Sequence, residues 1–279
     1  MVVFDAMDLA FDLRRGRPLL DTPPLACIAG APRCGTTSLA RMLAGHPNVC
    51  FSAVKEPHFF SRFDLNGAGD EELRAIVEEE YLGRYFPEIP AGTALLAEGS
   101  VSYLYAAHRM RPLLRLWPGA RFIIALRDPM ELLPSLHQRL LFQGDEDVSD
   151  FPTAWRLQAD RARGRRIPGR CVEPRQLQYA EVARLGKHLQ RFIDTVGRER
   201  CHIVVYDDLA ADPAAVYAGL LGFLGLPDDG RREFKQHRVG YGFKIGWLQR
   251  LLKRPPLLRN RPRPPPRSPT ARPNFARRG

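Results

Sequence analysis

The sequence predicts an α/β fold in which a central parallel sheet is covered by helices on both faces. Short apolar runs alternate with stretches of helical periodicity, which is the pattern of repeated βαβ units. The first run, residues 25–29 (LACIA), is continuous and ends at Gly30, as expected of a strand buried on both faces. Two later runs each precede an Asp-Pro helix start, Asp128-Pro129 and Asp212-Pro213. Ligands of such sheets bind at the carboxyl ends of the strands, so the loops that follow strands are the candidate sites.

Five short segments are predicted strands because they are rich in apolar and β-branched residues. The clearest is Arg121–Leu126 (RFIIAL), which has four apolar residues in its centre. The five predicted strands, in chain order, are residues 25–29, 49–51, 94–97, 121–126 and 202–206.

The predicted helices lie between these strands. Glu131 stands three residues after Asp128 and completes a capping box at the start of one helix, although Pro134 predicts a kink or irregular turn inside it. The arginine-rich residues 150–174 are predicted to form a loop or a loose helix. A charged amphipathic helix is predicted at residues 70–86. Three more helices are predicted from apolar residues at helical spacing, and the first of them is expected to end at His46-Pro47. Their apolar positions are Leu39, Met42 and Leu43 in the first, Leu177, Val182, Leu185, Leu189 and Phe192 in the second, and Val216, Leu220, Leu221 and Leu224 in the third.

The net charge of +11 is concentrated at one end of the 279-residue chain. Residues 253–279 hold nine Lys or Arg, eight prolines and no acidic residue, whereas the rest of the chain holds 33 basic and 31 acidic residues. A segment of that composition cannot build a core, so we predict a disordered tail that makes at most weak contact with an anionic surface and binds no specific nucleic acid. The predicted organisation is an extension at 1–23, one domain at 24–252 and this tail.

The cysteines and the apolar runs exclude several classes of protein. The five cysteines are widely spaced and include no CxxC pair, so neither a disulfide framework nor a zinc site is predicted. No apolar run is long enough to span a membrane, and the N-terminal residues do not form a secretory signal. A reducing, cytoplasmic location is therefore expected.

The loop after the first strand, residues 30–38 (GAPRCGTTS), has the glycine spacing of a phosphate-binding P-loop. The amides of Gly35, Thr36, Thr37 and Ser38 are expected to face an anion at the N-terminus of the next helix. The position of the nucleotide-binding lysine holds Thr36, and the cation of the loop is Arg33. This exchange argues against hydrolysis of ATP or GTP and favours a shorter anion.

Three segments in order resemble the sulfotransferases that use 3′-phosphoadenosine-5′-phosphosulfate (PAPS). GAPRCGTTSLARML followed by HPNVCFSAVKEPHFFS resembles the 5′-phosphosulfate-binding segment, and the KEPHFF version is similar to the branch with heparan sulfate sulfotransferases and many bacterial enzymes. RFIIALRDPMELLPSLHQRL resembles the 3′-phosphate segment, and VVYDDLAADPAAVYAGLLGFLGL the late strand and helix. The resemblance implies a three-layer P-loop-like sandwich and a transferase that moves a sulfuryl group from PAPS, without a metal, to a hydroxyl or amine.

The resemblance also implies which residues hold PAPS. Arg33 matches the loop lysine of the family, and we assign to it electrostatic stabilisation of the leaving phosphate. Arg127 and Ser135, eight residues apart, match the 3′-phosphate site. The remaining cofactor-binding residues are Cys34, Gly35, Thr36, Thr37 and Ser38 in the loop, with Lys235 and Arg238 in the expected last cofactor loop.

The acceptor side is predicted from the KEPHFF segment. Glu56 matches the base that deprotonates the acceptor, a role that burial would favour by raising its pKa, and His58 is the rival base or an acceptor contact. Lys55 and Ser100 are expected to bind the acceptor, a glycan or small molecule. Gly99 stands where relatives that act on glycosaminoglycans carry a lysine, which argues against that class of acceptor.

Two other functions remain open from the residues alone. A P-loop kinase or NTPase would show magnesium-dependent ATP turnover, with Asp128 or Asp207 as the magnesium ligand. A binding module that uses the basic tail would show salt-sensitive binding that disappears with the tail. The acceptor, the choice between O- and N-sulfation and the oligomeric state are not encoded in these patterns.

Overall fold

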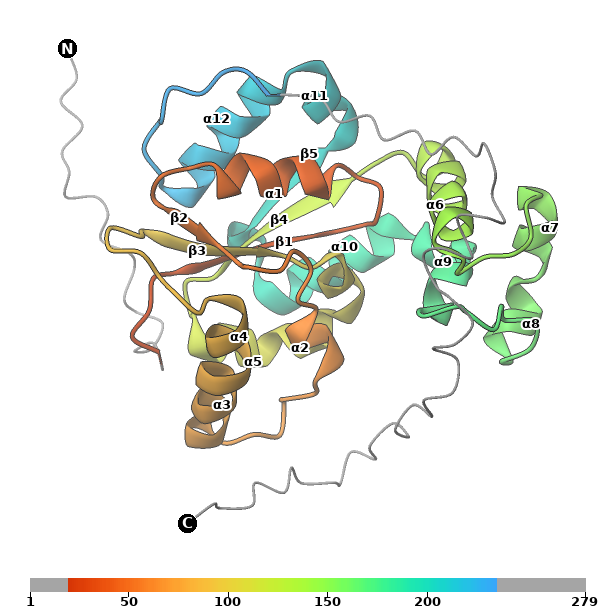
Figure 1. The fold of residues 1–279 in the computed structure, drawn as a ribbon, viewed down its shortest axis with the longest axis horizontal. Helices are drawn as coiled ribbons and strands as arrows, with labels where there is room; N and C mark the ends of the chain where they lie inside the picture. The colour runs from red at the N-terminus through yellow and green to blue at the C-terminus, as the bar shows by residue number, and fades with distance from the viewer. Residues whose placement is uncertain (1–19, 235–279) are drawn as a thin grey trace.

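The computed structural model describes residues 20–234, which form a five-stranded sheet between two layers of helices (Figure 1). All neighbouring strands are parallel, and their order is β2-β3-β1-β4-β5. The three-layer α/β fold predicted from the sequence is confirmed. The strands are β1 (Leu25–Gly30), β2 (Val49–Phe51), β3 (Leu95–Gly99), β4 (Arg121–Leu126) and β5 (Cys201–Val205).

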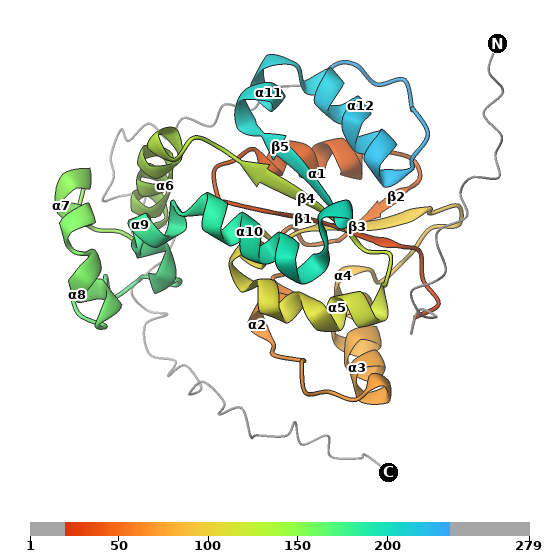
Figure 2. The ribbon, with the colours of Figure 1, turned by 180° about the vertical axis from the view of Figure 1, so that it is seen from behind.

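The helices occupy both faces of the sheet because the central strands are apolar on both faces. In β1, Ala26 and Ile28 face one buried cluster, whereas Cys27 and Ala29 face the other. Turning the molecule by 180° shows helices over both faces (Figure 2). The first face is covered by α1 (Thr36–Ala44) and α12 (Pro213–Leu224), and the second by α3 (Asp70–Ile76), α5 (Arg111–Leu116) and α10 (Leu185–Val196).

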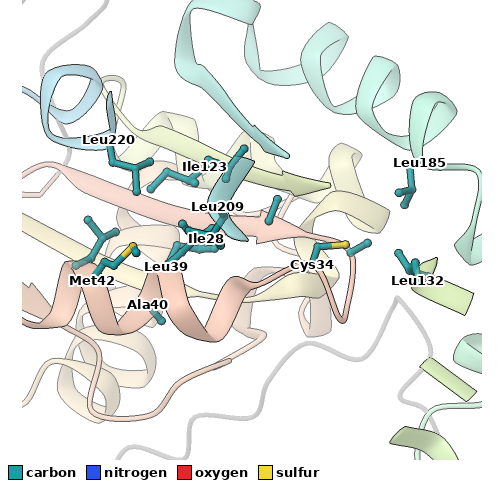
Figure 3. Packing of buried hydrophobic residues seen from close by; sticks show 14 of the residues in the cluster. Ile28, Cys34, Leu39, Ala40, Met42, Ile123, Leu132, Leu185, Leu209 and Leu220 are labelled. Atoms are coloured by element: carbon teal, nitrogen blue, oxygen red, sulfur yellow. The ribbon is translucent and has the colours of Figure 1, made fainter. Parts of the chain in front are cut away.

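The core under α1 is built from the positions expected at helical spacing. Leu39, Met42 and Leu43 are buried, and they pack with Ile123 of β4 and Leu220 of α12 (Figure 3). The predicted end of this helix at His46-Pro47 is confirmed, since α1 stops at Ala44.

Some predicted boundaries differ from the structure. The single helix expected at 70–86 is α3, a π-helical stretch η1 (Val77–Leu82) and α4 (Gly83–Tyr85). Strand β3 runs two residues further than expected because Gly99 still pairs with Ile28. The prediction missed the 3₁₀ helix η2 (Val101–Met110) and α5. The single helix expected from residue 177 is instead three helices, η3 (Pro174–Leu177), α9 (Tyr179–Val182) and α10. The remaining short helices are α2 (Phe59–Arg62), η4 (Arg198–Arg200) and α11 (Tyr206–Ala211).

The arginine-rich residues 150–174 include two short helices, α7 (Phe151–Arg156) and α8 (Gln158–Ala162). With α9 they lie beside α6 (Pro129–Gln143), at one end of the sheet (Figure 1). A hydrogen bond of 2.9 Å joins His137 of α6 to the Val148 carbonyl. We call α7, α8 and α9 the side lobe.

The predicted domain borders are only partly within the described residues. Leu20 is buried, and the Trp117 indole donates to the Thr22 hydroxyl at 3.0 Å. The last residues of the expected extension 1–23 therefore pack on the domain. The tail predicted at 253–279 and the end of the domain at 252 lie outside the described residues.

The strand order places the candidate loops at a switch in the chain path. The connection after β1 leads to the β2 side of the sheet, whereas the connection after β4 leads to β5 on the other side. The carboxyl ends of β1 and β4 therefore border a crevice of the kind in which parallel α/β sheets bind ligands.

Candidate active site

The loop between β1 and α1 requires glycine at two positions. Gly30 has φ 143°, and a Cβ there would lie 2.5 Å from the Ala125 carbonyl oxygen. Gly35 has φ 81°, and a Cβ there would lie 2.6 Å from a methyl carbon of Leu209. The two glycines allow the loop to turn tightly against β4 and α11. Helix α1 therefore begins with its backbone close to the loop and without a side-chain cap, which leaves its N-terminus suited to an anion.

Two arginines and a serine meet beside this loop. The Arg33 Nε donates to the Ser135 hydroxyl at 2.9 Å, across 102 residues of sequence. The Arg127 Nη1 lies 3.4 Å from the Arg33 carbonyl oxygen. Arg127 also stacks over the Tyr206 ring at 4.2 Å, and its Nη2 donates to Glu131 at 2.8 Å. The tertiary structure thus brings together the three residues that were predicted to bind the two anionic groups of PAPS.

The Glu131 contact corrects the predicted capping box. The Asp128 carboxylate does cap α6, accepting from the Met130 amide at 2.7 Å. Glu131 turns instead toward Arg127, because a hydrogen bond from a charged guanidinium to a carboxylate is stronger than one from a neutral backbone amide. Helix α6 extends through Pro134 to Gln143.

The other predicted cofactor residues are placed as follows. Cys34 points into the core (Figure 3), and burial raises the pKa of its thiol to about 12, so the thiol is not ionised at neutral pH. Thr36 is buried, whereas Thr37 is exposed. The Ser38 amide donates to the Gly35 carbonyl at 2.9 Å. Lys235 and Arg238 lie outside the described residues.

The segment from Lys55 to His58 follows β2 and forms an ion-paired turn. The Lys55 Nζ lies 2.5 Å from Glu56 Oε1, and His58 Nε2 lies 3.4 Å from Glu56 Oε2. Four non-glycine residues of the described chain have positive φ, and three are Arg33 (72°), Glu56 (66°) and His58 (55°). Such conformations cost about 1–3 kcal/mol each and cluster at functional sites. The strain supports a functional role for both loops.

The surroundings of Glu56 keep its carboxylate ionised. Burial by itself would raise its pKa, but the hydrogen bond from His58 and the charge of Lys55 outweigh burial and lower the pKa to about 2. The net shift is therefore opposite to the one that burial alone would give, because His58 and Lys55 both donate hydrogen bonds to the carboxylate. Glu56 is in the form that accepts a proton at neutral pH.

Ser100 lies behind this turn and is fully buried. Its hydroxyl accepts from the His58 amide at 2.9 Å and donates to Glu98 Oε2 at 2.6 Å. The Tyr103 hydroxyl hydrogen-bonds the same carboxylate and accepts from the Phe60 amide at 3.4 Å. Glu98 thus supports the backbone of the turn through two hydroxyl groups, while acceptor binding by Ser100 stays a prediction.

Burial determines the protonation of Glu98. The side chain is fully buried, and burial raises its pKa to about 7 against the donors Ser100 and Tyr103, which lower it. The native state therefore keeps a proton on Glu98 between about pH 4.5 and about 7 that the unfolded chain releases.

We expect the contribution of Glu98 to stability to fall as pH rises through this window. The folded-state pKa lies above the unfolded one, so the loss corresponds to on the order of 3 kcal/mol at about 1.4 kcal/mol per pKa unit. Glu98→Gln cannot titrate, and urea unfolding of both proteins from pH 4.5 to 8 should show a steeper decline for the wild type. Parallel pH curves would show that Glu98 has the same pKa in both states.

Sequence reasoning missed several residues of this site. Glu98 could have been found, because it is a charged residue inside an otherwise apolar strand. Ser61, Ser102 and Tyr206 carried no comparable signal, since their partners come from other elements.

The arrangement offers two kinds of chemistry at the carboxyl ends of strands in one parallel sheet. Fixed positive charge and a helix N-terminus lie at the ends of β1 and β4, where an anionic leaving group would be stabilised. A carboxylate and an imidazole lie after β2, where a proton could be removed. Within residues 20–234, no group of three or more His, Cys, Asp or Glu is placed to hold a metal ion, and no helix is both long and apolar enough to cross a bilayer.

Comparison with known proteins agrees with this geometry. Curated relatives include a Caenorhabditis briggsae bifunctional heparan sulfate N-deacetylase/N-sulfotransferase 1, 24% identical over 217 residues, and human carbohydrate sulfotransferase 15, 31% identical over 143 residues. These matches cover 74% and 39% of this chain but only 23% and 26% of the relatives, so the chain spans about a quarter of their length.

A sulfotransferase from Alicyclobacillus acidocaldarius is similar in structure. It has a TM-score of 0.63 and 27% identity, over 76% of this chain and 85% of the other. The family model described as "Sulfotransferase family" matches residues 24–230, which is most of the chain and contains both loops of the site. The chain therefore belongs to the sulfotransferase family.

Proposed function

We propose that this protein transfers a sulfuryl group from PAPS to a hydroxyl or amine of an acceptor. The observation that carries the proposal is the meeting of Arg33, Arg127 and Ser135 beside the glycine loop. Two separate cations at the end of a parallel sheet fit a donor with two anionic groups. The loop itself fits a close phosphate, because its two glycines let it turn tightly into α1, whose N-terminus has no side-chain cap.

Each group has a role that follows from its position. Arg33 and the first turn of α1 bind the 5′-phosphosulfate, and Arg127 with Ser135 binds the 3′-phosphate. The acceptor oxygen or nitrogen forms a bond to sulfur while the bond from sulfur to the phosphate oxygen breaks. The acceptor proton passes to Glu56, and the charge left on adenosine 3′,5′-bisphosphate is stabilised by Arg33.

The acceptor is expected to bind near the turn formed by Lys55, Glu56 and His58. Val54 and Phe63 flank this turn and are each about half exposed, so they offer apolar surface beside it. Lys55 is already paired with Glu56. An acceptor with apolar character therefore fits this rim, and glycans, lipids and phenols are the classes to compare with labelled PAPS.

Thermal-shift titration tests the donor assignment. Adenosine 3′,5′-bisphosphate should raise the melting temperature, and at about a hundred times Kd it should add on the order of 2.7 kcal/mol of stability. ATP and GTP should stabilise much less, because the loop lacks the nucleotide-binding lysine. Equal stabilisation by 5′-AMP would exclude a 3′-phosphate site.

A matched pair of arginine variants locates that site. Arg127→Ala should lose most of the preference for adenosine 3′,5′-bisphosphate over 5′-AMP. Arg84→Ala removes an arginine that is 63% exposed and pairs with Glu80, so it should behave as the wild type. A preference unchanged in both variants would remove Arg127 from the proposed site.

A further inference from the structure

The guanidinium of Arg127 is held from three directions. Its Nε and Nη2 both donate to one oxygen of Glu131, Oε2, at 3.1 and 2.8 Å. Its Nη1 donates to the Arg33 carbonyl oxygen at 3.4 Å, and its Cζ lies 4.2 Å from the centroid of the Tyr206 ring. The direction of each hydrogen bond is fixed, because a guanidinium only donates, whereas an ionised carboxylate and a carbonyl oxygen only accept.

These contacts leave some donors of Arg127 available. Nε carries one N–H group, and each terminal nitrogen carries two. The bonds to Glu131 and Arg33 use three of these groups, so one N–H group remains on Nη1 and one on Nη2. No other hydrogen bond within residues 20–234 uses them. An arginine with donors on both terminal nitrogens can bind the oxygens of one phosphate.

The groups that hold Arg127 belong to different elements of the site. Glu131 is in the first turn of α6, four residues after Arg127, and Tyr206 begins α11. The Tyr206 ring also packs on the glycine loop, since a Cβ on Gly35 would lie 3.2 Å from it. The orientation of Arg127 is therefore tied both to the loop and to α6, the helix that carries Ser135.

The ion pair matters for orientation more than for stability. The Glu131 side chain is 56% exposed and that of Arg127 is 18% exposed, and pairs at the surface add little to the stability of a fold. An arginine that is already fixed loses less conformational entropy when it binds a phosphate. Because Glu131 is exposed, water and salt screen the repulsion between its carboxylate and a bound phosphate.

We propose that Glu131 is a positioning residue, which fixes Arg127 so that its two remaining N–H groups receive the 3′-phosphate of the donor. The inference rests on the proposed sulfuryl transfer, because that function supplies a donor with a 3′-phosphate. Glu131 itself contacts neither the acceptor nor the reacting atoms. Its loss should therefore raise KM for PAPS and leave kcat nearly unchanged.

Two substitutions of Glu131 test the role of its oxygen. Both Arg127 bonds end on Oε2, so the single carbonyl oxygen of glutamine can replace them, whereas alanine cannot. Glu131→Ala should bind adenosine 3′,5′-bisphosphate about three- to tenfold more weakly, which is the effect of leaving one long side chain unfixed. Its affinity for 5′-AMP should not change. Glu131→Gln should keep most of the preference of the wild type, and calorimetric titration with both nucleotides measures the four affinities.

A matched ion pair elsewhere provides the control. Glu78 pairs with Arg74 at 2.8 Å, also four residues apart, and is 46% exposed. It lies in η1, which packs on the second face of the sheet, so Glu78→Ala should bind both nucleotides as the wild type does. Melting temperatures without ligand should be similar for all these variants, because each substitution is at the surface.

NMR of the arginine side chains gives a measurement that needs no ligand. The Nε–H signal of Arg127 is the one absent from Arg127→Ala. In the wild type and in Glu131→Gln this hydrogen should exchange slowly with water, because it is bonded to the side chain at position 131. In Glu131→Ala it should exchange faster.

Two results would overturn the inference. An unchanged preference for adenosine 3′,5′-bisphosphate in Glu131→Ala would show that Glu131 does not position Arg127. Tighter binding by both variants would show that Glu131 acts as a like charge that competes with the phosphate. Failure of adenosine 3′,5′-bisphosphate to bind the wild type would refute the proposed function instead, and the exchange of the Arg127 Nε–H would still show whether Glu131 orients the arginine.

Discussion

Replacing Glu56 with glutamine is expected to lower kcat by about 10²–10⁴-fold, the usual contribution of general-base catalysis. Glutamine keeps the size of the side chain but removes the proton acceptor. The substitution is informative because Glu56, whose pKa is lowered to about 2, is ionised at every pH at which the protein would be assayed. Steady-state kinetics with labelled PAPS and an acceptor found by screening measures the effect.

Donor binding is the control for this prediction. Donor binding is assigned to Arg33 and Arg127, which contact Ser135 and Glu131, and not to Glu56. Glu56→Gln should therefore retain its thermal shift with adenosine 3′,5′-bisphosphate. His58→Ala should lose less activity than Glu56→Gln, because Glu56 would still accept the proton.

Two results would change the assignment of the base. Near-normal turnover by Glu56→Gln together with an inactive His58→Ala would transfer the role to His58. Loss of both turnover and donor binding in Glu56→Gln would mean that Glu56 maintains the loop structure, and its catalytic role would have to be withdrawn.

Replacing Arg161 with methionine is expected to destabilise the protein by about 3–5 kcal/mol, the cost of leaving a buried charge without its partner. The two terminal guanidinium nitrogens of Arg161 donate to Glu146, at 2.6 and 2.7 Å, and neither side chain is exposed. Tyr179 donates to the same carboxylate at 2.8 Å. Removing the arginine leaves an ionised carboxylate in the centre of the side lobe.

Urea unfolding of Arg161→Met against the wild type measures this loss. Arg165→Ala is the matched control, because Arg165 pairs with Asp160 at the surface and is 62% exposed. A surface pair contributes about 0–1 kcal/mol. A double variant, Glu146→Leu with Arg161→Met, should recover part of the stability, since no buried charge remains. Equal unfolding curves for Arg161→Met and Arg165→Ala would show that the buried pair does not stabilise the fold.

The side lobe also connects this prediction to the site. Tyr179 packs against His137 of α6, with ring centroids 5.9 Å apart, and α6 carries Ser135. Hydrogen exchange of residues 151–162 would show whether Arg161→Met opens the lobe alone or the whole domain. Opening of the lobe should also weaken binding of adenosine 3′,5′-bisphosphate, because the helix that holds Ser135 would lose its support.

The sequence by itself determined the parallel sheet, the phosphate-type loop and the family. These features depend on order along the chain: apolar runs of strand length, glycines at fixed spacing and Asp-Pro helix starts. The strand at 121–126, the end of α1 before His46 and the start of α12 at Pro213 were all predicted correctly for that reason. Local backbone preferences are set by neighbours within a few residues, so they can be predicted from the sequence without knowledge of the tertiary structure.

Only the tertiary structure decided which side chains share hydrogen bonds. The pKa of Glu56 is lowered because His58 and Lys55 fold onto it, and the pKa of Glu98 is raised because the strands on both sides exclude water. The helices of the side lobe lack strong periodicity, and they are held by Glu146 and Arg161, whose pairing no local pattern indicates. Burial and hydrogen-bond partners depend on the packing of elements that are distant in sequence, and they set the pKa values of Glu56 and Glu98.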